Sequence, residues 1–335
     1  MTHQVYTSQS NLCESIFREM FKFYGKSEDY LIHGLTFFQS FPDLYKNQNF
    51  DILKAYLFYF AYRTKRFGSP LVKELLTQEY LNAQIVSPEE YLDFCMYCFY
   101  KGLYYIEKRN FFIATYLYCS AVEMGISNDS ERIIVFNEFT IQMIRSLCFL
   151  KVLSDFDINS HLFKKSRYNN FKENVNYDDI DDCFSFLNYD TITLEKFISF
   201  VNSNKEMYIN NKLIGLKNEA EEMLILKKIR DSIKVYKKIK LTKLSQSIKI
   251  DFNYLLKVIK KKCLSGELNV KYDEETDVIE VFDIDPGMKE RVKKTQEIFK
   301  DIIEANKNNF INLRDKKLLD LHKSNIIIPD EELDI

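Results

Sequence analysis

The chain has 335 residues, of which 46% are apolar and 29% charged, and its formal net charge is −2. This length and apolar content are enough for two packed units with a sizeable core. The near-neutral charge excludes a chain built throughout as a polycation for nucleic acid. Because Gly (8) and Pro (5) are scarce, we expect few loops and a mostly α-helical fold.

Cysteine usage and the absence of long apolar runs bear on location. Seven cysteines are scattered along the chain, an odd number that predicts no disulfide framework. Met1–Ser10 is polar, and no uninterrupted apolar run reaches the ~18 residues that span a bilayer. We therefore expect no secretory leader and no membrane partner, and a reducing intracellular compartment.

The first part of the chain predicts successive helices. Asn11–Gly25 and Tyr30–Phe41 have the pattern of a helical hairpin. Phe50–Arg63 is apolar almost all round, which is typical of a buried helix. Leu71–Leu81 follows a proline, and a further helix begins at Ser87-Pro88-Glu89-Glu90, where a capping serine precedes a first-turn proline. We expect that helix to run to about Ile106.

The next helical pair resembles one tetratricopeptide-like hairpin. Small and aromatic residues fall at the spacings at which such helices touch: Gly102, Tyr105, Ala114, Tyr118 and Ala121. Small residues allow a close approach of two helices, and aromatic rings fill the groove beside them. Glu107–Asn110 is the expected turn. The neighbouring hairpins fit this repeat loosely, so we expect an irregular array.

The chain changes character after an apolar helix predicted at Ile133–Leu153. Asp155–Asp182 is rich in Asn, Lys and Asp, with a strongly acidic end, and predicts a long polar connection. Helices are expected again at Leu194–Asn202 and Leu213–Lys228. The helical region as a whole is assigned to residues 1–226.

Residues 227–285 have the pattern of a winged helix. Helical patterns at Lys227–Lys238 and Leu241–Ile248 precede a third helix, which ends near Gly266. The apolar residues of that third helix recur at helical spacing: Phe252, Leu255, Leu256, Ile259 and Cys263. Two short alternating runs follow, one through Leu268, Val270 and Tyr272, the other at Val278–Phe282. The polar Asp273–Asp277 between them predicts a hairpin loop.

The remainder of the chain predicts one more helix and a short tail. Asp285-Pro286-Gly287 is a turn signal, and Met288–Leu321 has one apolar face. We assign 286–325 to a C-terminal bundle helix, whose apolar face needs a partner to cover it. Residues 326–335 form an acidic tail.

No catalytic or cofactor-binding pattern is present in the sequence. The four histidines are far apart, and nucleotide-binding glycine motifs and a nucleophile elbow are missing. Cys95-x-x-Cys98 is the one pair with metal-ligand spacing, but it has no second pair and is better interpreted as two core thiols. We therefore expect no enzyme, no metal and no cofactor.

Two functional interpretations of the winged helix remain open. Between Lys227 and Cys263, thirteen Lys and Arg residues stand against two Asp, and the third helix places Lys257, Lys260 and Lys261 opposite its apolar face. Such a face could meet phosphates, although no Arg is present from Asp251 to Phe282 to read guanine. Alternatively, a sheet-edge strand at Val278–Phe282, which carries apolar residues on both faces, would dock against similar subunits.

Two motifs in this region resemble the PCI domain family, which is found in the proteasome lid, the COP9 signalosome and translation initiation factor 3. Tyr236–Ser245 reads Tyr-x-x-Ile-x-Leu-x-x-Leu-Ser, similar to the family's entry to its winged helix. Gly266–Asp273 reads Gly-x-Leu-x-Val-x-Tyr-Asp, similar to its wing. The order of elements from about Asn11 to Asn312 is most similar to the lid members, and the signalosome members are the second choice. The longer N-terminal region and the charged tail of the lid members have no counterpart here.

The resemblance implies a non-catalytic assembly subunit in the cytoplasm and nucleus. Its expected partners are other PCI-domain lid subunits and the rest of the proteasome, in ubiquitin-dependent degradation; nucleic acid is the less favoured partner. Two sets of residues are the expected contacts. The first is the wing strand, with Val278, Ile279, Glu280, Val281 and Phe282. The second is the bundle helix, with Val292, Phe299, Ile302, Ile303 and Phe310.

Overall fold

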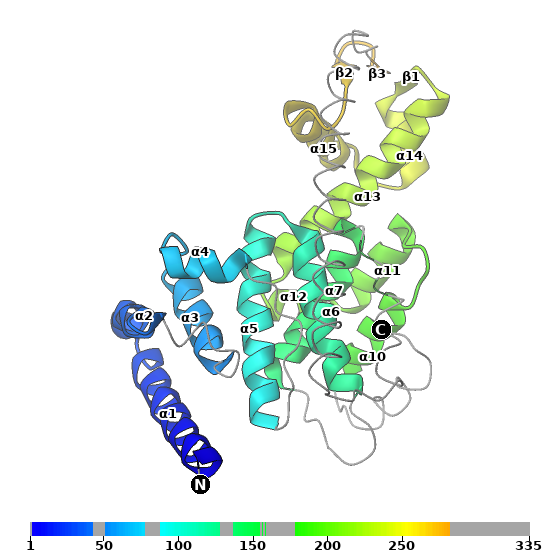
Figure 1. Ribbon diagram of the computed structural model, residues 1–335. Helices are drawn as coiled ribbons and strands as arrows, with labels where there is room; N and C mark the ends of the chain where they lie inside the picture. Colours follow the sequence, from blue (N-terminus) through cyan, green and yellow to red (C-terminus); the bar gives the residue numbers. More distant parts are fainter. Residues whose placement is uncertain are drawn as a thin grey trace, which may run out of the picture. The chain divides into compact units, whose positions relative to one another are not determined.

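The structure is a computed structural model that describes residues 2–42, 51–77, 88–127, 137–154, 156, 158 and 178–281 (Figure 1). The described part is mostly helical, as the composition predicts, with three short strands. It divides into two compact units, Met1–Leu224 (unit 1) and Ile225–Ile335 (unit 2).

Unit 1 is an all-helical array (Figure 1). Its helices are α1 (Thr2–Gly25), η1 (Glu28–Tyr30), α2 (Leu31–Gln39), α3 (Asp51–Arg63), α4 (Pro70–Thr77), α5 (Pro88–Glu107), α6 (Phe111–Ser127), α7 (Glu138–Leu153), α10 (Asp178–Leu187), α11 (Leu194–Ser203), α12 (Lys205–Asn210) and the first part of α13 (Ile214–Val235). Within it α2 packs on α3, α3 on α5, α5 on α6, α6 on α7, and α7 on α10.

The close approach of α5 and α6 depends on a glycine, as the sequence predicts. A Cβ atom at Gly102 would lie 2.2 Å from the ring of Tyr118, which is fully buried. Ala114 and Ala121 are also fully buried. Tyr105 has a different role, because its hydroxyl donates to the carbonyl of Leu76 in α4 at 2.9 Å. The small residues therefore set the helix spacing, and Tyr105 holds a neighbouring helix end.

Cationic side chains cap the C-terminal ends of neighbouring helices in unit 1. The buried amine of Lys101 donates to the Leu75 carbonyl of α4 at 3.3 Å and to the Tyr97 hydroxyl at 2.8 Å. Lys151 donates to the carbonyl of Leu187 at the end of α10 and to that of Tyr189 at 2.7 Å. The last carbonyls of a helix lack intrahelical partners and carry partial negative charge. A lysine amine there donates hydrogen bonds to these carbonyls and is attracted by their charge.

Part of the predicted polar connection is a helix, which corrects the sequence interpretation. Residues Asp178–Leu187 form α10, and its buried residues recur at helical spacing: Ile180, Cys183, Phe184 and Leu187. Asp182 is exposed, and Asp179 accepts a hydrogen bond from Arg145 of α7 at 2.6 Å. The charge of the segment concealed this apolar period. Residues 155, 157 and 159–177 of the predicted connection lie outside the described residues.

Several predicted helix limits also change. Leu213–Lys228 and Lys227–Lys238 were predicted as two helices, whereas α13 is continuous from Ile214 to Val235. The helix predicted from Ile133 begins at Glu138, because the Asn137 side chain accepts the Thr140 amide at 3.0 Å and caps it. The start of α5 at Pro88 confirms the predicted helix start, while the predicted cap, Ser87, lies outside the described residues.

Unit 2 combines the end of α13 with two further helices and a sheet. Its elements are β1 (Lys238–Lys240), α14 (Leu241–Ile248), α15 (Phe252–Leu264), β2 (Val270–Asp273) and β3 (Val278–Val281). The sheet is antiparallel with strand order β1-β3-β2. Its small core consists of buried aliphatic side chains: Leu241, Leu244, Ile248, Leu255, Val258, Ile259, Leu268 and Ile279.

The position of β3 overturns the prediction of an edge strand at Val278–Phe282. β1, which the sequence pattern did not reveal, pairs Ile239 with Ile279, and β2 pairs Tyr272 with the same residue on the other side. β3 is therefore the central strand, and its backbone is engaged on both sides. Phe282 and the predicted bundle-helix residues lie outside the described part of the chain.

Candidate interaction surface of unit 2

Helix α15 presents the lysines that the sequence placed on its outer face. The Asp251 side chain caps the helix by accepting the Tyr254 amide at 2.9 Å. Leu255, Val258 and Ile259 are buried against the unit 2 core. The opposite face carries only exposed side chains: Asn253, Lys257, Lys260, Lys261 and, at the end, Leu264. The predicted basic face is confirmed as a surface feature.

One lysine of this helix serves the fold. Lys262 is 3% exposed, and its amine donates to both carboxylate oxygens of Glu267 at 3.1 and 3.0 Å. Its carbonyl accepts the amides of Glu267 and Leu268, each at 3.0 Å. The turn between them passes through Gly266 at φ +73°, a backbone conformation that favours glycine. Lys262 therefore fixes the exit from α15 and adds nothing to the basic face.

The hairpin turn beside α15 carries the opposite charge. From Leu264 to Val281 the sequence contains six carboxylates and one lysine, and four of these acids lie in Asp273–Asp277. The Glu274 carboxylate forms an ion pair with the Lys260 amine at 3.0 Å, so the turn lies against the lysine face. Hydrogen bonds from the Thr276 hydroxyl and the Glu275 amide lower the pKa of Asp273, which favours its charged form. The turn thus offsets much of the helix's positive potential.

Asp277 fastens the hairpin turn to α14. Lys240 at the start of α14 provides no side-chain cap. Instead, the Asp277 carboxylate accepts the Thr242 amide at 3.2 Å and the Thr242 hydroxyl, while its carbonyl accepts the Leu241 amide at 2.9 Å. The Tyr272 hydroxyl donates to the second carboxylate oxygen at 3.3 Å. A carboxylate at a helix N-terminus is favourable, so this contact fixes the turn relative to the helices.

The outer face of the sheet has charged side chains at its centre. In register, Glu280 of β3 lies opposite Lys238 of β1 and Lys271 of β2, and the Lys238 amine approaches its carboxylate at 2.8 Å. Ile279, on the inner face, is fully buried. The strand has apolar residues on both faces, as predicted, because half-buried Val278 shares this face with exposed Glu280; the neighbours of Glu280 across the sheet are charged.

The true edges of the sheet belong to β1 and β2. β1 is three residues long and is preceded by exposed Tyr236 and Lys237, features that limit strand pairing. At the β2 edge, the Val270 carbonyl accepts the Cys263 thiol at 3.4 Å. The β1 edge is thus short and lysine-rich, and the β2 edge is partly engaged by the end of α15.

Unit 1 contains the cysteine pair and a hollow. Cys95 and Cys98 are buried inside α5, as core thiols should be, and Cys95 lies 3.4 Å from the Thr140 hydroxyl. Among the residues the structure describes, no group of three His, Cys, Asp or Glu side chains is placed to hold a metal ion.

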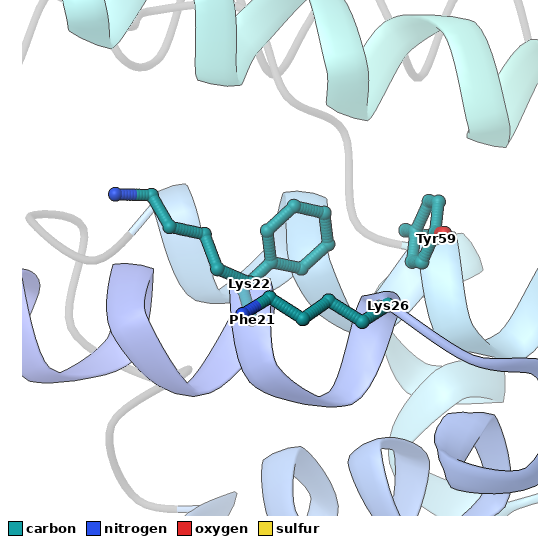
Figure 2. Close-up of a pocket in the computed structure, with 5 residues that line it drawn as sticks. Phe21, Lys22, Lys26 and Tyr59 are labelled. Atoms are coloured by element: carbon teal, nitrogen blue, oxygen red, sulfur yellow. The ribbon is translucent and has the colours of Figure 1, made fainter.

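The hollow, of about 350 Å³, lies between α1 and α3 (Figure 2). It is lined by Phe21, Lys22, Gly25, Lys26 and Tyr59. Figure 2 shows the Lys22 amine directed away from the Tyr59 ring, and that amine is paired with Glu19 at 2.8 Å. Small-molecule sites usually have a few polar groups that converge on the ligand. This hollow does not have that arrangement.

Three features of unit 2 escaped the sequence analysis: β1, the burial of Lys262 and the capping by Asp277. β1 has only Ile239 between two lysines, too short a run for alternation to be detected. Asp277 acts on a residue 35 positions earlier, and no local pattern encodes that pairing. For α14, the sequence shows only that no Ser, Thr, Asp or Asn stands directly before Leu241 to cap the helix.

Comparison with protein-family models and with curated proteins found no match for the chain. Within the described ranges, no helix has the length and apolar character needed to cross a membrane.

Proposed function

We propose that this chain is a non-catalytic structural subunit of the regulatory-particle lid of the 26S proteasome, most similar to lid subunit 3. In this proposal unit 1 is an irregular tetratricopeptide-like array and unit 2 the winged-helix part of a PCI domain. Two observations support the assignment. The motifs at Tyr236–Ser245 and Gly266–Asp273 resemble those of the family, and the order helix–strand–helix–helix–strand–strand suits a winged helix.

Each family-like motif falls on an element that the PCI interpretation requires. Tyr236–Ser245 covers β1 and the first part of α14, and its Leu241 and Leu244 are buried in the unit 2 core. Gly266–Asp273 covers the exit from α15 and all of β2, with Leu268 and Val270 buried. These four leucine and valine positions of the motifs are therefore core positions, whereas Tyr236 is exposed.

The observation that favours assembly over nucleic-acid binding is the acidic turn beside α15. Phosphate binding requires a surface of net positive potential, and each phosphate neutralised adds to the affinity at low salt. Here Lys260 is already paired with Glu274, and three further carboxylates lie in the same turn. Lys238 is likewise paired with Glu280. A surface with adjacent fixed charges of both signs suits a protein partner with the complementary arrangement.

The docking elements differ from those first expected. Because β3 is central, the edges of the described sheet that a neighbouring subunit could reach are that of β1 and the part of the β2 edge that α15 leaves open. The predicted C-terminal helix, with Val292, Phe299 and Phe310 on its apolar face, is the second proposed element. It needs a covering partner whichever complex the chain enters.

The proposal is tested by affinity purification of the tagged full chain from its own cells, followed by mass spectrometry. We expect the other lid subunits and whole proteasomes to co-purify. Deleting Met288–Ile335 should remove them, whereas deleting only residues 326–335 is the matched control and should retain them. Recovery of signalosome subunits, with cullin modification increased on loss of the chain, would assign it instead to subunit 3 of that complex. Recovery of neither complex would overturn the proposal.

A further inference from the structure

Helices α7 and α10 bring two cysteine thiols into contact. The Cys148 thiol of α7 donates to the backbone carbonyl of Cys183 in α10, with 3.7 Å between sulfur and oxygen. The two thiols also lie within hydrogen-bonding range of each other. Both residues are 0% exposed, and they are 35 positions apart in the sequence. The packing of the two helices, and no local motif, therefore brings these sulfurs together.

The two cysteines lie in the middle of a regular register between the helices. Three successive contacts join α7 to α10: Arg145 with Asp179, Cys148 with Cys183, and Lys151 with Leu187. The contact positions advance by three residues along α7 and by four along α10, and both steps keep a residue on one face of a helix. Because the positions increase together, the two helices run in the same direction. A contact made by a cationic side chain on either side of the cysteines thus holds the thiols face to face.

Two thiols that face each other across a helix pair are positioned to become a disulfide. A disulfide forms by exchange, in which a thiolate attacks an existing disulfide and expels one of its sulfurs. Burial raises the pKa of the Cys148 thiol well above its usual value, and the neighbouring Cys183 raises it further. Because the thiolate is the nucleophile, the closed helix pair reacts slowly. Exchange becomes fast only when α10 opens away from α7.

We propose that Cys148 and Cys183 form a disulfide between α7 and α10 when the thiol–disulfide pool around the chain becomes oxidising. Oxidised glutathione is a sufficient oxidant. One cysteine thiolate attacks it, which gives a mixed disulfide and releases one glutathione thiolate. The other cysteine then attacks the protein sulfur of the mixed disulfide, so that the new S–S bond joins the two cysteines and a second glutathione leaves. The two cysteine protons end on the two glutathione molecules, which are thereby reduced. This inference does not rest on the proposed function.

The disulfide fixes α10 to the helical array. It closes the chain between the two cysteines into a loop, and such a cross-link reduces the conformational freedom of the unfolded chain. The oxidised chain should therefore resist unfolding more than the reduced chain, and α10 should open less often. Burial also shields the formed bond from reductants. The reduced and oxidised chains are thus two states of unit 1 that differ in how firmly α10 is held.

The test is incubation of the purified full chain with oxidised glutathione at several urea concentrations below the unfolding transition. The remaining thiols are then blocked in denaturant, and the digested chain is analysed by mass spectrometry. We expect a peptide pair joined through Cys148 and Cys183, and, before blocking, a chain lighter by two hydrogen atoms. The linked peptide should form faster as the urea concentration rises, because opening of α10 exposes the thiols.

Variants separate this pair from the other cysteines. Cys148→Ser and Cys183→Ser should each abolish the linked peptide. Cys119→Ser is the matched control, because Cys119 is 1% exposed but lies on α6, and it should leave the linked peptide unchanged. The stability measurement needs no variant. In the parent chain, oxidation should raise the urea midpoint and slow amide hydrogen exchange of α10 about tenfold or more.

Three results would overturn the proposal. The parent chain could retain both thiols at every urea concentration below the transition, with glutathione bound only at exposed Cys13. The linked peptide could join other cysteines instead, such as Cys95 with Cys98. The Cys148–Cys183 disulfide could also form without raising the urea midpoint, which would mean that it does not fix α10.

Discussion

The two units differ in how far charged side chains enter the fold. Unit 1 has exposed ion pairs, such as that of Lys65 with Glu107, but it also has buried charges: Lys101 is 3% exposed and caps α4, and Asp93 is 5% exposed and pairs with Arg18 at 2.8 Å. In unit 2, apart from Lys262, charges lie on the surface and pair across neighbouring elements, as Lys260 does with Glu274 and Lys238 with Glu280. We therefore expect the buried charges of unit 1 to act on stability, and we propose that the surface charges of unit 2 act on the choice of partner. The predictions below test that difference, beginning with the packing that holds the unit 1 helices together.

The largest effect is expected at the contact between α5 and α6. Gly102→Ala introduces a Cβ 2.2 Å from the ring of Tyr118, which is fully buried, so the ring or a helix has to shift. Overpacking of a buried contact should lower the free energy of unfolding of unit 1 by roughly 3 kcal/mol or more. Gly215→Ala in α13 is the matched control, since nothing lies within 4 Å of its added Cβ. It should be neutral or slightly stabilising. Equal denaturation midpoints for the two variants would refute the close-approach argument.

A pH-dependent effect is expected from Asp93. Burial raises the pKa of its carboxyl to about 6, although Arg18 acts to lower it. The folded pKa lies above that of the unfolded chain, near 4, so the folded state binds the proton more tightly between these values. Stabilisation by the protonated form is complete below about pH 4 and is lost as the pH rises to about 6, a change of about 2 to 3 kcal/mol.

Urea titrations at several pH values measure this contribution. The difference in unfolding free energy between the parent chain and Asp93→Asn isolates it from the other carboxylates. That difference should change between pH 4 and 6 and be constant above pH 7. A difference that does not vary with pH would show that Asp93 has an ordinary pKa.

Loss of the buried cation should have the next largest effect. Lys101→Met keeps most of the side-chain volume but removes the donor to the Leu75 carbonyl and the Tyr97 hydroxyl. We expect a loss of about 2 kcal/mol, because buried acceptors are left without this partner. Lys108→Met, on the exposed end of the same segment, should cost less than about 0.5 kcal/mol. Similar losses of unfolding free energy in both variants would mean that the buried hydrogen bonds of Lys101 do not contribute to stability.

The smallest of these effects is expected in unit 2. Asp277→Ala removes the cap of α14 and should cost about 1 kcal/mol, while Asp277→Asn keeps an acceptor oxygen and should cost less. Asp277 has φ +53°, a conformation that glycine adopts more easily than alanine. Because Asp277→Gly and Asp277→Ala both lose the carboxylate, the difference between their stabilities measures the backbone strain. Hydrogen exchange of the Thr242 amide reports the cap directly. Unchanged exchange in Asp277→Ala would exclude the capping role.

The sequence predicted those parts of the two units that depend on local pattern. The start of α5, the helix at Phe252–Leu264 and the close approach at Gly102 all follow from residues within one or two turns of each other. It failed at α10, where acidic residues concealed a local apolar period, and at β1, which is defined only by its pairing with β3 forty residues later.

The candidate surface shows the same limit. The lysines of α15 could be placed on one face from their spacing, because a helix has a fixed period. Their neutralisation could not be predicted, since Glu274 reaches Lys260 only through the hairpin that β2 and β3 form. An error in the strand order likewise led to β3 being expected as the docking element, in place of β1 or β2.

The most direct test of the assembly account is binding of the full chain to labelled duplex DNA and single-stranded RNA at about 50 mM salt, followed by fluorescence anisotropy. The account predicts no saturable binding by the parent chain. It predicts a gain of salt-sensitive binding when Glu274→Gln and Glu275→Gln remove two of the turn's negative charges. Saturable binding by the parent chain, with a steep salt dependence and loss in Lys257→Glu/Lys261→Glu, would contradict it.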